Sequence, residues 1–215
     1  MQVIEGELIA VKEEYADERR TELVLHGREI SAEDLVADEA CVVTVSHAGY
    51  VKRVPLDVYQ AQNRGGRGKT AATTRSEDFV ENIYVASTHS YVLIFTDKGK
   101  VYWLKVHEIP TGSRTSRGKP IVNLINIEKG EKISAILPVR EFEEGHYLVF
   151  ATKLGYIKKT DMMSFAKPRS NGLIALTIDE DDTLINVVRT KGECDILVGT
   201  RMGMAIRFSE DDVRP

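Results

Sequence analysis

The sequence predicts an all-β fold, a propeller-like array of about four similar units that follows a short N-terminal helix and a connector. Three observations lead to this prediction. From Leu35 onward the chain reads as short β-rich runs broken by Gly, Asn, Asp and Pro. One hairpin pattern occurs four times, and a second pattern keeps step with it at a period of roughly 50 residues. Small sheets of this size need neighbours to cover their faces, which favours an array.

The N-terminal region differs from the rest. Apolar residues at positions 4, 8, 11 and 15 have the spacing of one helical face, so we expect a helix over residues 3–15. Residues 18–34 are polar and charged and read as a connector, in which residues 21–25 are compatible with a short strand. The β unit is expected to occupy residues 35–215.

The repeated hairpin consists of a β-run, a Ser/Thr-x-x-Gly-x turn and a second β-run that ends in basic or aromatic residues. Glycine suits this turn because it adopts positive φ without strain. The turn glycines are separated by 50, 56 and 48 residues, and the hairpins occupy residues 45–53, 95–103, 151–159 and 199–207. The second pattern reads Arg67-Gly68-Lys69, Arg117-Gly118-Lys119 and Asn171-Gly172-Leu173. The repeat unit is therefore all-β.

Charge is distributed unevenly along the chain, although the net charge is −4. Residues 1–47 carry 4 basic and 12 acidic side chains, residues 48–120 carry 12 and 6, and residues 121–215 carry 13 and 15. Binding to nucleic acid depends on local fields more than on totals. The middle segment therefore predicts a basic stripe between acidic patches.

A glycine-rich basic loop follows the first hairpin, at residues 62–69. Its glycines allow close approach of the backbone, and its Arg and Lys side chains supply charge for clamping phosphates. It lacks the GxxxxGK[ST] spacing of a Walker P-loop. Composition alone fits a flexible solvated loop equally well.

Three segments together resemble the C-terminal domain of DNA gyrase A subunits: residues 34–39, the hairpin end 50–53 and the loop 62–68. The loop matches the family's Gln-Arg-Arg-Gly-Gly-Arg/Lys-Gly box at every position except Asn63. The resemblance implies a β-pinwheel of four-stranded blades that exchange strands. It also implies that residues 1–34 are the end of the preceding domain's helix plus a connector, and that residues 35–215 are a partial pinwheel of about four blades, where the family continues into further blades.

By the same resemblance, the rim of the pinwheel binds and wraps double-stranded DNA without reading its sequence. This wrapping supports ATP-dependent negative supercoiling by the whole enzyme. By the resemblance, that enzyme is an A2B2 assembly, in which the partners of this chain are the rest of the A subunit and the B subunit. The DNA-wrapping box falls on Gln62, Asn63, Arg64, Gly65, Gly66, Arg67 and Gly68. Repeat position assigns the DNA-binding rim to Lys52, Arg53, Lys69, Lys98, Lys100, Arg114, Arg117, Lys119, Lys158, Lys159, Arg201 and Arg207.

Neither catalysis nor a metal or cofactor site is predicted. The five histidines are scattered, no Gly-x-Ser-x-Gly elbow is present, and the two cysteines lack metal-ligand spacing. The acidic run 179–182 reads as a solvated turn. The family's catalytic tyrosine belongs to the preceding domain, so the chain is expected to bind DNA and not to cut it. Short apolar runs and an acidic N-terminus predict a cytoplasmic chain without a membrane partner.

Three alternatives remain open at this stage. The equivalent domain of topoisomerase IV generally has a degenerate box, so the nearly intact box favours gyrase. A propeller-like protein-interaction scaffold would fit the repeats, although WD and kelch signatures are missing. A propeller-borne hydrolase would need histidines and carboxylates that converge on a central channel, for which the sequence offers no clear set.

Overall fold

The computed structural model describes residues 2–17, 21, 32–59 and 78–214. The chain divides into two compact units, residues 1–32 and residues 33–215. Apart from Thr21, the short strand expected at residues 21–25 lies outside the described residues. In the described parts of the chain, no helix has the length and apolar character needed to cross a membrane.

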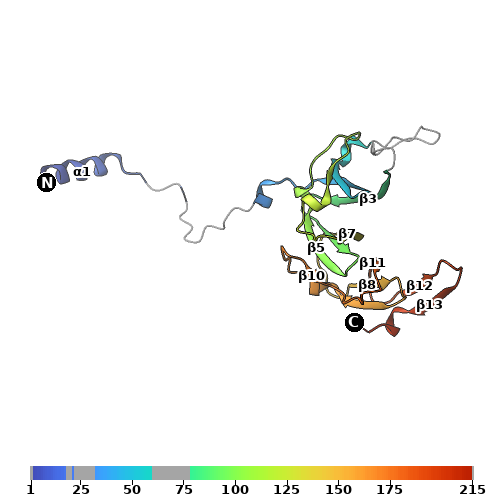
Figure 1. Cartoon of the computed structure of the whole chain (residues 1–215). Coiled ribbons are helices and arrows are strands. Elements are labelled where there is room, and N and C mark those ends of the chain that lie inside the picture. Colours follow the sequence, from blue (N-terminus) through green and yellow to red (C-terminus); the bar gives the residue numbers. More distant parts are fainter. Residues whose placement is uncertain (1, 18–20, 22–31, 60–77, 215) are drawn as a thin grey trace. The chain divides into compact units, whose positions relative to one another are not determined.

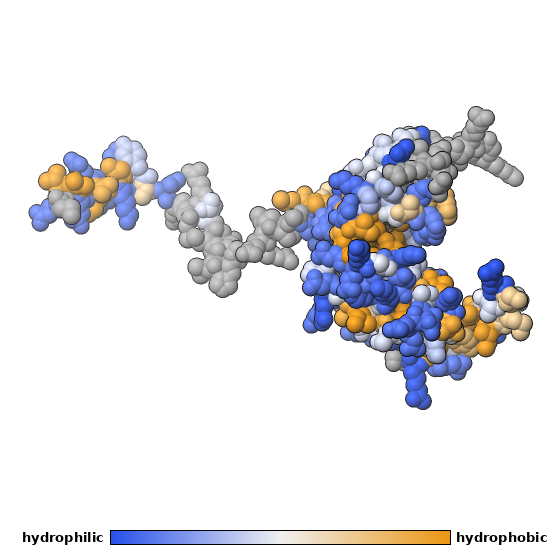
Figure 2. All heavy atoms as spheres, viewed as in Figure 1, coloured by the Kyte–Doolittle hydropathy of each residue, from blue (hydrophilic) through white to orange (hydrophobic). Residues whose placement is uncertain are grey.

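The first unit contains the expected helix, α1 (Gln2–Tyr15). An acidic side chain, Glu5, lies in its first turn and a basic one, Lys12, in its last turn, which matches the helix dipole. No residue of α1 is buried, and its apolar positions, Leu8 and Tyr15 among them, are exposed. Figure 2 shows these apolar residues interleaved with charged ones along the helix. The predicted helix is therefore confirmed.

The second unit is built from strands and short 3-10 helices, as predicted (Figure 1). Its described strands are β1 (Ala40–Ser46), β2 (Tyr50–Pro55), β3 (Val80–Ser87), β4 (Tyr91–Thr96), β5 (Lys100–Lys105), β6 (Lys119–Pro120), β7 (Ile133–Val139), β8 (Tyr147–Thr152), β9 (Ile157–Asp161), β10 (Leu173–Ile174), β11 (Leu184–Thr190), β12 (Asp195–Gly199) and β13 (Ala205–Ser209). The 3-10 helices are η1 (Ala32–Leu35), η2 (Leu56–Val58), η3 (Val106–Glu108), η4 (Ile121–Asn123), η5 (Met162–Phe165) and η6 (Glu210–Asp212).

The strands form four sheets, one around each predicted hairpin. The strand orders are β3-β1-β2-β6, β10-β5-β4-β7, β11-β8-β9 and β12-β13. The outer strand β6 follows the second hairpin along the chain, and β10 follows the third, so each closes the sheet of the preceding repeat. The expectation of four strands holds for the first two sheets. Within the described residues the third sheet has three strands and the fourth has two.

The Ser/Thr-x-x-Gly motif makes the same turn in every hairpin. In the first hairpin Gly49 N donates to Ser46 O (2.9 Å), and Tyr50 N donates to Ser46 Oγ (3.2 Å). The other three hairpins repeat both bonds around Thr96, Thr152 and Thr200. All four turn glycines have φ between 78° and 93°. The hydroxyl and the glycine are thus the local cause of the repeat.

In the described part of the chain the core consists of two clusters that meet at β4. Val92 and Ile94 belong to a cluster with the first sheet, whereas Leu93 and Phe95 belong to a cluster with the third sheet. Because alternate side chains of a strand point to opposite faces, β4 is buried on both sides and reads as an unbroken apolar run. The Phe95 ring packs edge-on against Phe150, with centroids 5.6 Å apart. Neighbouring repeats therefore share a core.

Candidate nucleic-acid interface

The segment Gln62–Gly68, assigned to the DNA-wrapping box, and Lys69 lie outside the described residues, so their role stays a prediction. Along the sequence this segment comes after η2 and before β3. In the sequence, the segment therefore falls between two strands of the first sheet, β2 and β3.

A loop of the second repeat, residues 111–119, lies against the first sheet, and we call it the cationic loop. Its sequence, Thr-Gly-Ser-Arg-Thr-Ser-Arg-Gly-Lys, contains three cations and no carboxylate. Its C-terminal end enters β6, which pairs with β2. Near its other end, Arg53 N donates to Pro110 O (3.1 Å) and Gly112 N donates to Arg53 O (3.0 Å). The loop is therefore attached to β2 on both sides.

Glycine is required where the loop crosses β2. Gly118 has φ +83°, and a Cβ at this position would overlap the carbonyl oxygen of Val51 and lie 2.8 Å from its carbonyl carbon. Gly172 of the next repeat has φ +75°, and a Cβ there would lie 2.8 Å from the Tyr102 ring. Both glycines belong to the second repeated pattern found in the sequence. That pattern lets the connecting chain lie directly against the preceding hairpin.

Lys52 is assigned to the rim by its repeat position, but the structure places it in the interior, with 2% of its surface exposed. Its ammonium donates to the carbonyl oxygens of Ser113 (3.1 Å), Arg114 (2.6 Å) and Ser116 (2.9 Å). Burial lowers the pKa of Lys52 below its usual value. An ammonium has three N–H donors, so none is left for a phosphate. The rim assignment of Lys52 is corrected accordingly.

The neighbouring position in the repeat also binds backbone. Bonds from three side chains join the second strand of one hairpin to residues after the next hairpin: Arg53 Nε to Ile109 O (2.8 Å), Trp103 Nε1 to Phe165 O (2.9 Å) and Lys159 Nζ to Glu210 O (3.2 Å). Lys159 is 5% exposed, so its rim assignment is also corrected. The basic and aromatic hairpin ends thus connect adjacent repeats. Two other aromatic residues of the second hairpin, Phe95 and Tyr102, are buried in the core.

Three predicted rim residues come together on the cationic loop. Arg117 and Lys119 are exposed and Arg114 is half-buried, and among the described residues none of the three has a side-chain partner. The exposed hydroxyl residues Ser113 and Thr115 flank Arg114 in the same loop. Hydroxyls also bind phosphate oxygens. These two residues were not singled out from the sequence, although a nine-residue run of Arg, Lys, Ser, Thr and Gly without an acid was a usable signal.

The other rim residues are dispersed over the remaining hairpins. Lys98 and Arg201 are exposed on hairpin turns. Lys158 is exposed, and its ammonium donates to Ala175 O (2.9 Å). Arg207 pairs with Asp195 at 3.6 Å in an exposed position, where such pairs contribute little.

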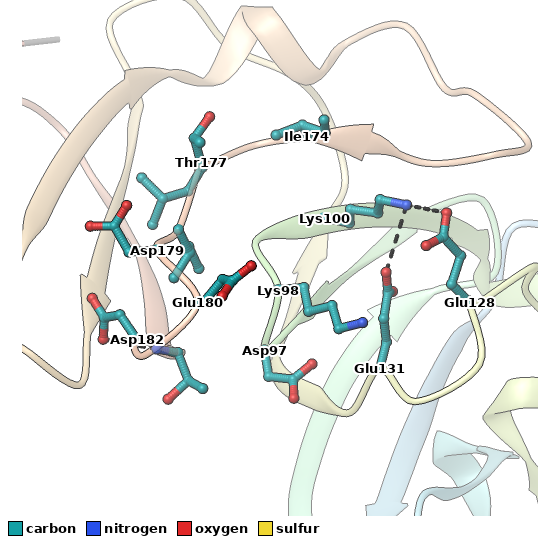
Figure 3. Close-up of a pocket in the computed structure, with 13 residues that line it drawn as sticks. Asp97, Lys98, Lys100, Glu128, Glu131, Ile174, Thr177, Asp179, Glu180 and Asp182 are labelled. Carbon is teal, nitrogen blue, oxygen red and sulfur yellow. Dashed lines mark hydrogen bonds and ion pairs between the residues drawn. The ribbon is translucent and has the colours of Figure 1, made fainter.

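Acidic side chains dominate one region that was not predicted from the sequence, a pocket of about 600 Å³ shown in Figure 3. Lys100 is engaged there by Glu128 and by Glu131 (3.6 Å), and the hydrogen bond to Glu128 raises the pKa of Lys100. The pocket is lined by Lys98 and Lys100 together with Asp97, Glu128, Glu131, Asp179, Glu180 and Asp182. Its carboxylates oppose a phosphate backbone, so the predicted basic rim is interrupted at the second hairpin.

Comparison with known proteins decides the family. The family model described as the DNA gyrase C-terminal domain, a beta-propeller, matches residues 42–87, 90–140, 146–191 and 195–215, one segment for each predicted hairpin. This chain belongs to that family. The gyrase A resemblance and the repeat prediction are therefore confirmed.

Curated relatives agree with this assignment. The DNA gyrase A subunit of Salmonella typhimurium is 46% identical over 214 residues, covering 100% of this chain and 24% of the relative. The DNA gyrase A subunit of Neisseria gonorrhoeae is 48% identical over 209 residues, covering 97% of this chain and 23% of the relative. The chain thus spans about a quarter of the length of these relatives.

Solved structures share the fold. The C-terminal domain of a DNA topoisomerase IV superposes with a TM-score of 0.70 at 32% identity, covering 83% of this chain and 54% of that chain. A DNA gyrase A C-terminal domain superposes with a TM-score of 0.63 at 24% identity, covering 82% of this chain and 56% of that chain, which shows the fold alone. Of these two solved structures the topoisomerase IV domain is the more similar, so the choice of gyrase rests on the family model and on the curated gyrase A subunits.

Proposed function

We propose that the chain binds double-stranded DNA without reading its base sequence and wraps it for the supercoiling reaction of a gyrase. The observation that carries the proposal is the cationic loop, in which Arg114, Arg117 and Lys119 lie together without an acid and are held on a sheet. Contacts from Arg, Lys and hydroxyl side chains to phosphates fix DNA in place but carry no sequence information. Kinship with gyrase A subunits supports the same function.

The energetics require more than this loop. At 0.15 M salt one phosphate contact raises affinity about fivefold relative to 1 M salt, or about 1 kcal/mol, because affinity varies with salt to a power of about −0.9 per contact. Bending a 20–30 base-pair segment by 40–90° costs about 1–6 kcal/mol. Three contacts offset only the lower half of that range. The box Gln62–Gly68, Lys69 and the exposed cations Lys158 and Arg201 belong to the same proposed DNA path.

The proposal extends to the whole enzyme. The chain is assigned binding and wrapping, while the rest of the A subunit supplies the catalytic tyrosine and the B subunit supplies ATP dependence in an A2B2 assembly. On this proposal the chain acts on DNA in the cytoplasm. Its support is the relatives' identity as DNA gyrase A subunits, of which the chain matches about a quarter.

The test compares two triple variants of the full chain by fluorescence anisotropy. The probes are labelled duplexes of two unrelated sequences, each about 40 base pairs long, which exceeds the 20–30 base pairs of the bending estimate. One variant replaces Arg114, Arg117 and Lys119 by Gln. The control replaces Lys129, Lys167 and Lys191, which are exposed and are not assigned to the proposed DNA path. We expect the loop variant to lose roughly 150-fold in affinity at 0.15 M salt and about 2.7 from the slope of log affinity against log salt.

The control variant is expected to lose far less, and both duplexes are expected to bind the unsubstituted chain equally. Equal losses in the two variants would show that only general charge matters and would contradict the loop's role. No binding by the unsubstituted chain, or a strong preference for one duplex, would contradict the proposed function.

A further inference from the structure

The buried Lys52 is the centre of the cationic loop's backbone structure. Its three donor N–H groups are all occupied by loop carbonyls, those of Ser113, Arg114 and Ser116. The loop closes on itself at the same point, because Ser116 N and Ser116 Oγ both donate to Ser113 O, at 3.1 Å and 2.8 Å. Lys52 therefore determines which way these carbonyls face.

This arrangement connects a buried charge to the exposed cations. Arg114 is itself one of the residues whose carbonyl binds the ammonium, and Arg117 follows directly after another, Ser116. With these carbonyls turned towards Lys52, the peptide units that carry both arginines are fixed in orientation. A buried ammonium is tolerated only when it is fully hydrogen-bonded, so the charge and the loop conformation depend on each other.

We propose that Lys52 is a positioning residue for DNA binding: by gathering the loop carbonyls it holds the cationic loop in the conformation that presents Arg114, Arg117 and Lys119 to consecutive phosphates. Lys52 itself does not touch the DNA. This inference rests on the proposed function, but its structural half, the ordering of the loop, is measurable without DNA.

The first variant is Lys52→Met, which keeps the length of the side chain and removes the donors. Its matched control is Lys129→Met, which removes one exposed lysine. Hydrogen exchange read by mass spectrometry is expected to accelerate about tenfold or more in residues 112–118 of Lys52→Met, with the β8–β9 hairpin unchanged. Exchange in the control is expected to match the unsubstituted chain. Unchanged exchange in the loop of Lys52→Met would overturn the inference even if DNA binding is normal.

The DNA measurement asks whether Lys52 acts through the loop cations. Lys52→Met is expected to weaken duplex binding by between about fivefold and 150-fold at 0.15 M salt, the range set by losing one to three contacts. When Arg114, Arg117 and Lys119 are already Gln, the same substitution is expected to change affinity less than twofold. An equal loss in both backgrounds would mean that Lys52 acts elsewhere and would overturn the inference.

A second variant covers the case in which Lys52→Met fails to fold. A Cβ at Gly112 would overlap Ser116 Oγ, so Gly112→Ala forces that hydroxyl away from Ser113 O and breaks a hydrogen bond that closes the loop, without removing a charge. We expect Gly112→Ala to weaken DNA binding and Gly112→Ala combined with Ser116→Ala to restore part of it. Unchanged binding in Gly112→Ala, despite altered loop exchange, would overturn the inference. Absence of DNA binding by the unsubstituted chain would overturn the proposed function and the positioning role, whereas the exchange experiment would still report whether Lys52 orders the loop.

Discussion

Replacing Glu210 with glutamine is expected to loosen the fourth sheet from the third. Glu210 has 0% of its surface exposed and begins η6, directly after the last strand of the fourth sheet. Its carboxylate lies 3.8 Å from the ammonium of Lys159 on the third sheet, accepts from the Thr190 hydroxyl and accepts from Cys194 N (3.2 Å). One carboxylate therefore joins residues of two sheets.

The magnitude follows from the burial of both charges. Removing one member of a buried pair leaves the other without a counter-charge and costs about 3–5 kcal/mol. Glu210→Gln and Lys159→Met are each expected to cost this much. The double variant is expected to cost less than either, since the junction of the second and third repeats has Trp103 at the position of Lys159 and Met162 at that of Glu210, both without a charge.

The assay is a double-mutant cycle on the opening free energy of β12 and β13, measured by native-state hydrogen exchange, with urea unfolding of the whole chain in parallel. The matched control is Asp195→Asn, which disrupts an exposed pair with Arg207 and is expected to cost less than about 1 kcal/mol. Additive losses, within about 0.5 kcal/mol, would refute the view that the two charges act as a pair.

Three further predictions concern the cationic loop, the loss of stability at acid pH and the reactivity of the two thiols. Gly118→Ala forces positive φ on alanine and overlaps a carbonyl oxygen of β2, so it should lower the melting temperature and weaken duplex binding more than Gly130→Ala, which has the same positive φ but open space for a Cβ. The hydrogen bond from Lys105 holds the pKa of Glu33 below its usual range. The ionised Glu33 therefore stabilises the fold fully above about pH 5, and this stabilisation is lost as the pH falls below about 4. The melting temperature of Glu33→Gln should fall less at acid pH than that of the unsubstituted chain, and an equal fall would contradict this. Burial raises the pKa of the Cys41 thiol while Cys194 is exposed, so a thiol reagent at about pH 8, near the usual thiol pKa, should titrate Cys194 alone in the native chain; fast reaction of both would contradict the burial.

The fold could be predicted from the sequence because its determinants are local. A hydroxyl residue and a glycine specify each hairpin turn, and the turn recurs at a nearly constant period. The glycine of the second pattern similarly marks where the connecting segment packs directly against the preceding hairpin. The exchange of closing strands between repeats entered only through the resemblance, because the pairing of β6 with β2 joins segments far apart in the sequence, Val51 with Lys119 for example, and has no local signature.

The site was only partly predictable, because repeat position does not say which way a lysine points. Nothing in the sequence distinguishes Lys52 from Lys119, yet the Lys52 ammonium is hydrogen-bonded to loop carbonyls in the interior and Lys119 is exposed. Long-range contacts make that difference. The acidic run 179–182 shows the same limit: it was expected to be solvated, but Asp182 is buried and accepts from Leu154 N (2.9 Å) on the turn of the third hairpin.

Wrapping is tested most directly by sealing nicked circular DNA with ligase in the presence of increasing amounts of this chain and reading the linking-number distribution on a gel. The proposed function predicts a dose-dependent shift of the distribution in one direction, which shrinks when Arg114, Arg117 and Lys119 are replaced by Gln. An unchanged distribution at concentrations that saturate the DNA would contradict wrapping.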